Sequence, residues 1–174
     1  MKHMKTKLFT LLGALFLVAY SNAQDVDFGL TAGYFNADAK LEVDGDNFDV
    51  DGEGGFYGGV VLDFSVSDKF GVRPELIYVN VNESSALFLP VMAKIGLVKG
   101  LHIQAGPQFG ISLEEVPDDA SSFDFDLAAG LGFDFPLGVF VEARYAFQVN
   151  NAYTGDLDIL AKGRYLTFGV GFKF

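Results

Sequence analysis

The sequence contains no cysteine and no tryptophan among its 174 residues, and it has only two histidines. Without cysteine there is no disulfide framework, no thiolate zinc site and no cysteine nucleophile. Basic residues are also scarce, with 12 lysines and arginines against 23 aspartates and glutamates and a formal net charge of −11. Such a chain is a poor match for nucleic acid, which requires phosphate neutralisation, so we expect no nucleic acid partner.

The longest apolar run lies close to the N-terminus. Three lysines precede the apolar stretch 8–20, and Ser21 and Ala23 supply small residues for a cleavage site. This pattern is typical of a secretory signal peptide, and the stretch is too short to span a bilayer, which needs about 20 residues. We therefore predict a signal peptide over 1–23, cleaved after Ala23, and a single domain over 24–174.

The rest of the chain lacks a helical period and alternates with period 2 instead. Eight runs of about ten residues each place apolar side chains on one face and polar or small ones on the other. Tyrosine is the one ionisable residue on the apolar face, because every Asp, Glu, Lys, Arg and His in the runs falls on the second face. The runs are 27–34, 56–64, 70–79, 87–97, 101–112, 123–134, 139–148 and 166–174.

Eight consecutive runs of this kind predict an all-β fold, an eight-stranded antiparallel up-and-down transmembrane β-barrel with lipid against its apolar face. A closed barrel satisfies every backbone group of a sheet within a bilayer. The connections alternate between long and short, as in outer-membrane barrels with long outer loops and short periplasmic turns. The long connections are roughly 36–54, 79–86, 113–122 and 148–164, and the short ones are 65–69, 98–100 and 136–138.

Three prolines interrupt the predicted strands. Pro74, Pro90 and Pro107 lie inside runs that otherwise read as strands. Proline cannot donate a ladder hydrogen bond, and a closed barrel has no edge to accommodate it. We expect bulges or local gaps in the ladder at these positions.

Five segments carry a resemblance to a known family, ALFLPVMAKIGL (86–97), LHIQAGPQFGIS (101–112), DLAAGLGFDF (126–135), VFVEARYAF (139–147) and YLTFGVGFKF (165–174). Together they resemble the small outer-membrane β-barrel proteins of Bacteroidota, the PorT-like family. Phe174, with Phe172 two positions before it, is similar to the C-terminal signal by which such barrels are recognised for insertion. The resemblance implies an eight-stranded barrel in the cell outer membrane and a transient contact with the barrel-assembly machinery. It implies no single activity, although some members serve type IX secretion or gliding.

The stretch LEVDGDNFDVDGEGGF, residues 41–56, concentrates acidic side chains. An EF-hand frame that starts at Asn47 places Gly58 where the loop needs glutamate, so the motif is incomplete. An exposed hairpin explains the stretch better, with 41–43 and 48–50 extending two strands around an Asp-Gly turn. Weak divalent-ion binding is the alternative. Its candidate ligands are Asp44, Asp46, Asp49, Asp51 and Glu53.

Opposite charges fall on the predicted lumen face. An eight-stranded barrel is filled by its own side chains, and an unpaired charge inside it is costly. We therefore predict a salt-bridge network that closes the lumen, with a proton or ion path as the alternative. Its members are Arg73, Glu75, Lys94, Asp126, Glu142 and Arg144.

Catalytic constellations are missing from the pattern. His102 and Ser112 lie ten positions apart on one predicted strand, roughly 33 Å if extended, which is too far for a catalytic pair. We expect no catalytic residues and no cofactor. The sequence favours a non-enzymatic outer-membrane barrel with a structural, binding or accessory role in the cell envelope through its long acidic outer loops. Its expected partners are outer-membrane lipid and an envelope protein. A small channel, a lipid-modifying outer-membrane enzyme and a secreted lipocalin-like barrel remain as alternatives.

Overall fold

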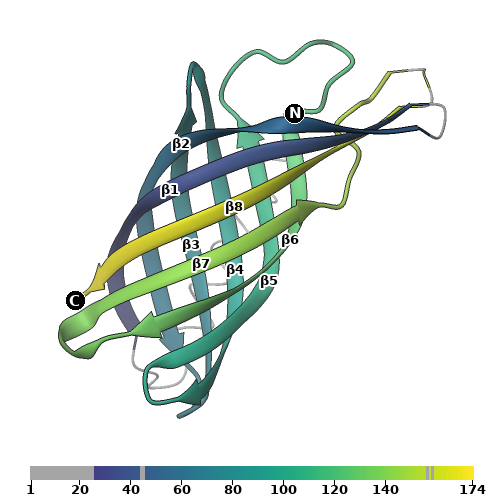
Figure 1. Cartoon of the computed structure of the whole chain (residues 1–174). Helices are drawn as coiled ribbons and strands as arrows, with labels where there is room; N and C mark the ends of the chain where they lie inside the picture. Colours follow the sequence, from purple (N-terminus) through teal and green to yellow (C-terminus); the bar gives the residue numbers. More distant parts are fainter. Residues whose placement is uncertain (1–25, 44–45, 156, 158) are drawn as a thin grey trace, which may run out of the picture.

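Eight antiparallel strands close into a barrel in chain order (Figure 1). The computed structural model describes residues 26–43, 46–155, 157 and 159–174, so the predicted signal peptide lies outside the described residues. The barrel closes because β1 pairs with β8 as well as with β2. The predicted eight-stranded antiparallel barrel is thus confirmed. The strands are β1 (Val26–Val43), β2 (Asp46–Ser65), β3 (Phe70–Val81), β4 (Ser84–Val98), β5 (Leu101–Ser112), β6 (Phe123–Asp134), β7 (Val139–Gln148) and β8 (Ile159–Lys173).

Helical structure is confined to one turn among the described residues. The 3₁₀ element η1 (Pro136–Gly138) connects β6 to β7. None of the described helices is long and apolar enough to cross a membrane.

Apolar side chains point outward and charged side chains point into the lumen. Leu30, Val60 and Leu76 are neighbours on β1, β2 and β3, and each is exposed on the outside of the barrel. The next residue on β2, Val61, is fully buried inside and lies opposite buried Glu75. This orientation is the reverse of a lipocalin-like barrel, which keeps its apolar face inside, so the structure contradicts that alternative.

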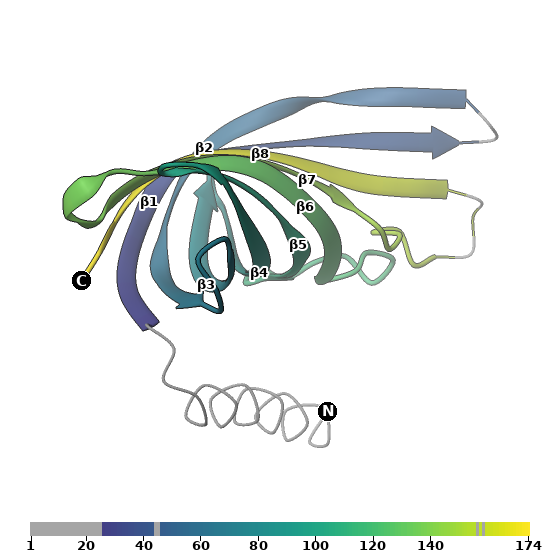
Figure 2. The same ribbon diagram turned by 90° about the horizontal axis from the view of Figure 1, so that it is seen from below.

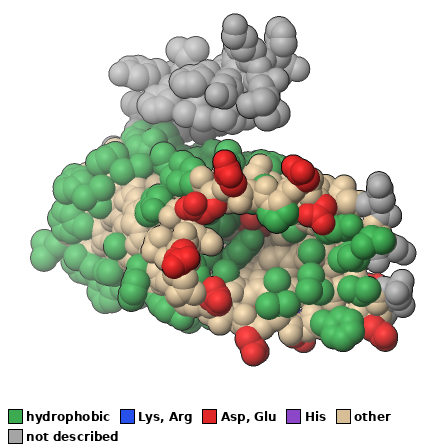
Figure 3. Space-filling model, turned by 90° about the horizontal axis from the view of Figure 1, so that it is seen from above, with side chains coloured by type: hydrophobic (Ala, Val, Ile, Leu, Met, Phe, Trp, Pro, Cys, Tyr) green, Lys and Arg blue, Asp and Glu red, His purple; other side chains and the backbone are tan. Residues whose placement is uncertain are grey.

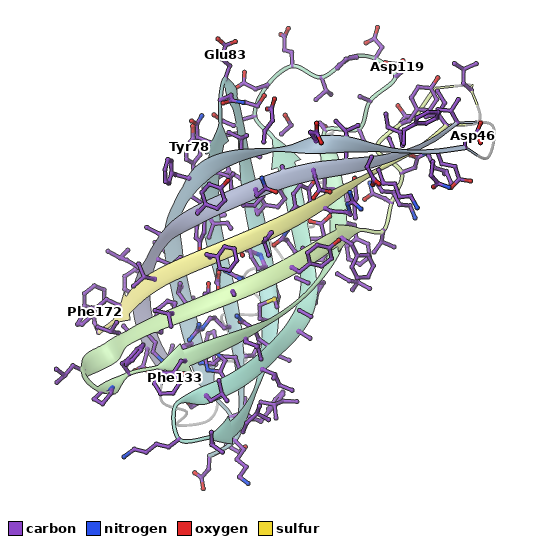
Figure 4. The ribbon with its side chains drawn as sticks, in the orientation of Figure 1. Asp46, Tyr78, Glu83, Asp119, Phe133 and Phe172 are labelled. Atoms are coloured by element: carbon purple, nitrogen blue, oxygen red, sulfur yellow. The ribbon has the colours of Figure 1, made fainter. Side chains whose placement is uncertain are left out.

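Aromatic rings gather at both rims of the apolar outer surface. Phe28 stacks on Phe174 with ring centroids 5.9 Å apart, and Tyr34 meets Phe56 edge to face at 6.2 Å. Figure 4 places Phe133 and Phe172 toward one end of the barrel and Tyr78 toward the other. Two aromatic girdles around an apolar band are the pattern of barrels that cross a membrane.

The two ends of the barrel differ, and we call them the short-turn end and the long-loop end. The short-turn end carries the connections 66–69, 99–100 and 135–138 together with the described chain ends, as predicted (Figures 1 and 2). At the long-loop end, 113–122 and 149–158 are long connections.

Three of the predicted long connections differ from those in the structure. The loop predicted at 79–86 is wrong, because β3 and β4 join through Asn82 and Glu83 alone. Asn82 adopts a positive φ of 52°, which asparagine tolerates and a tight turn requires. The region 36–54 is strand apart from the turn, in agreement with the hairpin interpretation of 41–50. The loop predicted at 148–164 ends earlier than expected, because β8 begins at Ile159.

The three strand prolines interrupt the ladder without shifting it. Pairing is missing beside Pro74 between β2 and β3, beside Pro90 between β3 and β4, and beside Pro107 between β4 and β5. The register is the same on both sides of each gap. The expected ladder gaps are therefore confirmed, and bulges are not needed at these positions.

Candidate functional site

Ion pairs fill the lumen near the short-turn end. Arg73 is fully buried and donates from Nη2 to Asp63 Oδ2 at 2.7 Å and from Nη1 to Glu142 Oε2 at 3.2 Å. Its guanidinium also lies over the Phe140 ring, 4.5 Å from the centroid. Lys94 Nζ donates to the same Asp63 oxygen at 2.7 Å. The cations and anions of four strands thus neutralise one another inside the barrel.

A second arginine extends this network toward the middle of the barrel. Arg144 Nη2 donates to Glu75 Oε2 and to Glu142 Oε1, both at 2.6 Å. Glu142 therefore joins both arginines. At the short-turn end, Lys173 Nζ lies 3.0 Å from Asp63 and 3.1 Å from Asp134. Five of the six predicted network residues are brought together in this way.

Asp126 is the exception and corrects the prediction. Its carboxylate is fully buried, but it accepts a hydrogen bond from Gln108 Nε2 at 2.8 Å and forms no ion pair with a described residue. The strand register explains the separation, because β6 places Asp126 between Gln108 and Gln148 on the neighbouring strands. An apolar layer that contains Met92 lies in the barrel as well, so Asp126 belongs to a second, amide-lined polar region.

Three aromatic rings meet across the lumen. Phe35 on β1, Phe88 on β4 and Tyr165 on β8 have centroid separations of 5.4 to 5.5 Å. Phe35 and Phe88 belong to a buried apolar cluster with Tyr57 and Ile77. Because β4 lies opposite β1 and β8 in the strand order, these rings bridge the two walls of the barrel. The lumen is therefore blocked by an apolar layer in addition to the ion pairs.

The blocked lumen predicts that the purified protein conducts no ions. Reconstituted in a planar bilayer, it is expected to leave the membrane current at the baseline, because neither the ion pairs nor the aromatic layer leaves an aqueous path. A porin inserted in the same membrane serves as the positive control. Stable unitary current steps that scale with protein concentration would contradict this expectation.

Close packing surrounds two lumen glycines and His102, which is the one histidine among the described residues. A side chain at Gly169 would collide with the Tyr57 hydroxyl, and one at Gly132 would collide with the His102 ring. His102 Nδ1 lies 3.3 Å from Asp134 Oδ2 at the short-turn end. Ser112 lies at the other end of the same strand. Its Oγ donates to Glu114 O and accepts a hydrogen bond from Glu114 N. The two side chains are thus held apart.

β1, β2 and β8 project beyond the other strands at the long-loop end (Figures 1 and 2). We call the projecting residues 39–43, 46–54 and 159–163 the sheet extension. Its ladder is continuous, because Leu41 pairs with Phe48 on one side and with Ala161 on the other. Figure 4 places Asp46 at its tip. The sequence pattern gave a signal for the hairpin of β1 and β2 but none for the third strand.

The polarity of the two faces inverts where the sheet extension leaves the barrel. Below this level the outward positions are apolar, as at Tyr34 on β1 and Leu166 on β8. Above it the outward positions are mostly charged, with Leu160 as an apolar exception, and the face that continues the lumen side is mostly apolar, with Asp46 as the exception at its tip. Alternation and register assign the residues to faces. The outward set includes Asp38, Lys40, Glu42, Asp49, Lys162 and Arg164, and the apolar set comprises Ala39, Leu41, Val43, Phe48, Val50, Ile159 and Ala161.

A bulge between β1 and β2 produces this inversion on β2. Ala37 pairs with Glu53, but Ala39 pairs with Val50, so β2 has one residue more than β1 in this interval. The extra residue changes which alternate positions of β2 face the lumen side. As a result, Phe48 and Val50 share the apolar face with β1, and both remain exposed, at 54% and 44%.

Arg164 ties the three strands together at the base of the sheet extension. Its guanidinium donates from Nε to Asp38 on β1 and from Nη2 to Asp49 on β2, the latter at 2.9 Å. The hydrogen bond that Arg164 donates to Asp38, together with the neighbouring negative charges, raises the pKa of Arg164 above its ordinary value. This charged clip lies on the outward face, opposite the apolar side chains.

The candidate ion ligands are spread along β2. Asp49 is engaged by Arg164, and Glu53 accepts a hydrogen bond from Asn82 Nδ2 at 2.8 Å. Asp44 lies outside the described residues. Within the parts of the chain that the structure describes, no three metal-binding side chains form a group that could hold an ion. Ion binding by this hairpin stays a prediction.

Acidic side chains dominate the long-loop end. Figure 3 looks onto this end and shows red side chains around the rim of a hollow, with no lysine or arginine in view. Glu83 and Asp119 lie at the tips of two other connections there (Figure 4). Phe172 and Phe174, by contrast, lie at the short-turn end, where Phe174 N donates to Phe28 O at 2.8 Å. Their role as an assembly signal stays a prediction.

The structure defines a class of protein, the small eight-stranded antiparallel barrel with an apolar exterior and a polar, filled lumen. Solved structures that resemble it include small outer-membrane barrels of eight strands. One is Ail, the attachment invasion locus protein of Yersinia pestis, in complex with the heparin analogue sucrose octasulfate. Its TM-score is 0.50 at 16% sequence identity, and the match covers 86% of this chain and 99% of that chain. Another is Neisserial surface protein A, NspA, with a TM-score of 0.50, 14% identity and the same coverage.

At these identities the likeness shows the fold alone. No family model matches the sequence, and no curated protein matches it significantly. The resemblance to the PorT-like proteins of Bacteroidota therefore stays a hypothesis.

Proposed function

We propose that the protein is a non-enzymatic outer-membrane barrel that displays the sheet extension as a binding surface in the cell envelope. The observation that carries this proposal is the inversion of polarity at the level of Arg164. Below that level apolar side chains face outward, as required in contact with lipid. Above it the outward face is mainly charged, as is usual in contact with water.

The binding role rests on what the barrel leaves accessible. Ion pairs and the ring cluster of Phe35, Phe88 and Tyr165 occupy the lumen, so an internal transport or catalytic site is not favoured. The sheet extension is instead held rigidly by a ladder and by the Arg164 clip. It presents exposed Phe48 and Val50 next to acidic side chains, a combination that suits a protein partner.

The proposed partners are of three kinds. Outer-membrane lipid covers the apolar belt, and the barrel-assembly machinery contacts Phe172 and Phe174 during insertion. An envelope protein binds the sheet extension. Export through a signal peptide that is cleaved after Ala23 accounts for the route to the outer membrane.

Site-specific photo-crosslinking tests the binding role. A photoreactive amino acid replaces Phe48 on the sheet extension or, as the matched control, Leu76 on the apolar belt, since both side chains are about half exposed. After irradiation of intact cells, we expect a discrete protein adduct from position 48 and none from position 76. Adducts from neither position, in a barrel that is correctly folded, would refute the proposed function.

A further inference from the structure

One edge of the sheet extension is covered and the other is open. On the β8 edge, Asn151 Nδ2 donates to Ile159 O, and Ala161 N donates to Asn151 Oδ1, both at 2.8 Å. Gly163 N donates to Gln148 Oε1, also at 2.8 Å. The connection between β7 and β8 thus satisfies the backbone of this edge.

The β2 edge has no such cover. The ladder with β3 ends at the pair of Phe56 with Asn80, so residues 46–54 of β2 pair with β1 alone. All nine of these residues are exposed. Across the described residues, the hydrogen bonds of this segment outside β1 come from two side chains, Asn82 to Glu53 and Arg164 to Asp49. Alternate N–H and C=O groups along the edge are therefore open to pairing with another strand.

The charge of the open edge restricts its partner. Asp46, Asp49, Asp51 and Glu53 lie within eight residues, and the segment contains no basic residue. A second copy that paired through the same edge would bring these carboxylates against their counterparts, which is unfavourable. A strand with basic side chains would instead meet opposite charges, and apolar side chains at its alternate positions would extend the face of Phe48 and Val50.

We propose that residues 46–54 of β2 bind a cationic, extended segment of a partner protein, which adds to the sheet extension as a fourth strand. This inference rests on the proposed function and specifies its partner by chemistry. Backbone hydrogen bonds along the open edge supply the register, and the carboxylates select for basic side chains.

A synthetic peptide tests the proposal on the full-length barrel in detergent micelles. The probe is a fluorescein-labelled nonapeptide that alternates lysine with valine, and its binding is followed by fluorescence anisotropy. A control peptide has the same lysines with prolines in place of the valines, so that it keeps the charge and loses alternate N–H donors. We expect the control to bind at least about ten-fold more weakly, because strand addition depends on those donors.

Matched variants of the barrel separate the open edge from general acidity. The double variant Asp46→Asn with Asp51→Asn removes two carboxylates from the edge, and neither forms an ion pair in the described structure. The double variant Glu114→Gln with Asp118→Asn removes the same charge from the connection between β5 and β6. We expect the first to weaken binding by about five-fold or more and the second by less than about two-fold, since the second pair of carboxylates lies on another connection and not on the open edge.

Amide hydrogen exchange supplies the structural readout. Bound peptide is expected to slow exchange within 46–54 and to leave the other described strands unchanged. Absence of peptide binding, equal binding of the proline control, or protection confined to another segment would each overturn the proposal. The two failures are distinguishable, because a crosslink from position 48 without peptide binding refutes strand addition alone, whereas no crosslink refutes the proposed function.

Discussion

Replacing Arg144 by alanine is expected to lower the free energy of unfolding by about 3–5 kcal/mol, the usual cost of removing one member of a buried ion pair. Arg144 Nη2 donates to both Glu75 and Glu142 at 2.6 Å, and all three side chains are buried. The variant leaves two carboxylates in the lumen with Arg73 as the nearest remaining cation, bound to Glu142. The measurement is urea unfolding of the barrel in lipid vesicles, followed by the shift between folded and unfolded bands on an unheated gel.

Arg164→Ala is the matched control. Arg164 also pairs with two carboxylates, those of Asp38 and Asp49, but it lies on the outward face of the sheet extension. Pairs in contact with water contribute little, so the expected loss is at most about 1 kcal/mol. If both variants unfolded at the same urea concentration as the native protein, burial of the network would not contribute to stability.

A second variant separates lost charge from lost packing. Arg144→Met combined with Glu75→Gln removes one cation and one anion and keeps the side-chain volumes similar. Part of the stability lost in Arg144→Ala should return, because the lumen no longer holds the excess carboxylate. A double variant that is as unstable as Arg144→Ala would assign the loss to packing instead.

The fold could be predicted from the sequence because the side chains of a barrel strand alternate strictly between two environments. Lipid tolerates no charge, so every charged residue in eight runs had to fall on one face, and the structure places that face in the lumen. The same argument predicted five residues that meet in the network, and it also included Asp126, which lies outside the network. It missed Asp63, Asp134 and Lys173, which lie near strand ends, because strand ends cannot be assigned to the lumen or to water from alternation alone. All three nevertheless share the period of the charged face.

The sheet extension could be predicted only in part, for a different reason. The bulge opposite Asp38 inverts the face of β2 without interrupting its alternation. The period-2 pattern of the sequence therefore continues through 46–54, although the apolar residues there lie on the opposite face of the sheet. From the sequence alone, this segment is interpreted as a loop that could form a hairpin. The third strand, beginning at Ile159, follows residues with little alternation, and its pairing with β1 depends on a contact across more than a hundred residues. Such long-range pairing carries no local signal.

Val60→Arg is expected to destabilise the inserted barrel by about 2–4 kcal/mol, the cost of an arginine on the lipid face at the middle of a bilayer. Val60 is the central outward residue of β2 between Phe56 and Phe64, and its neighbours on both sides are apolar, Leu30 and Leu76. The measurement is the fraction of folded protein recovered after insertion into lipid vesicles, together with its unfolding midpoint in urea.

Asn47→Arg is the control, because it adds the same charge to an exposed position on the outward face of the sheet extension. It should leave insertion and stability unchanged, since that face is in water. The pair of variants tests the inversion of polarity directly. If the exterior of the barrel were in water throughout, Val60→Arg would be as harmless as Asn47→Arg, because an exposed valine replaced by arginine costs a soluble protein little. A large difference between the two variants is therefore expected only if lipid covers the level of Val60 and ends below the level of Asn47.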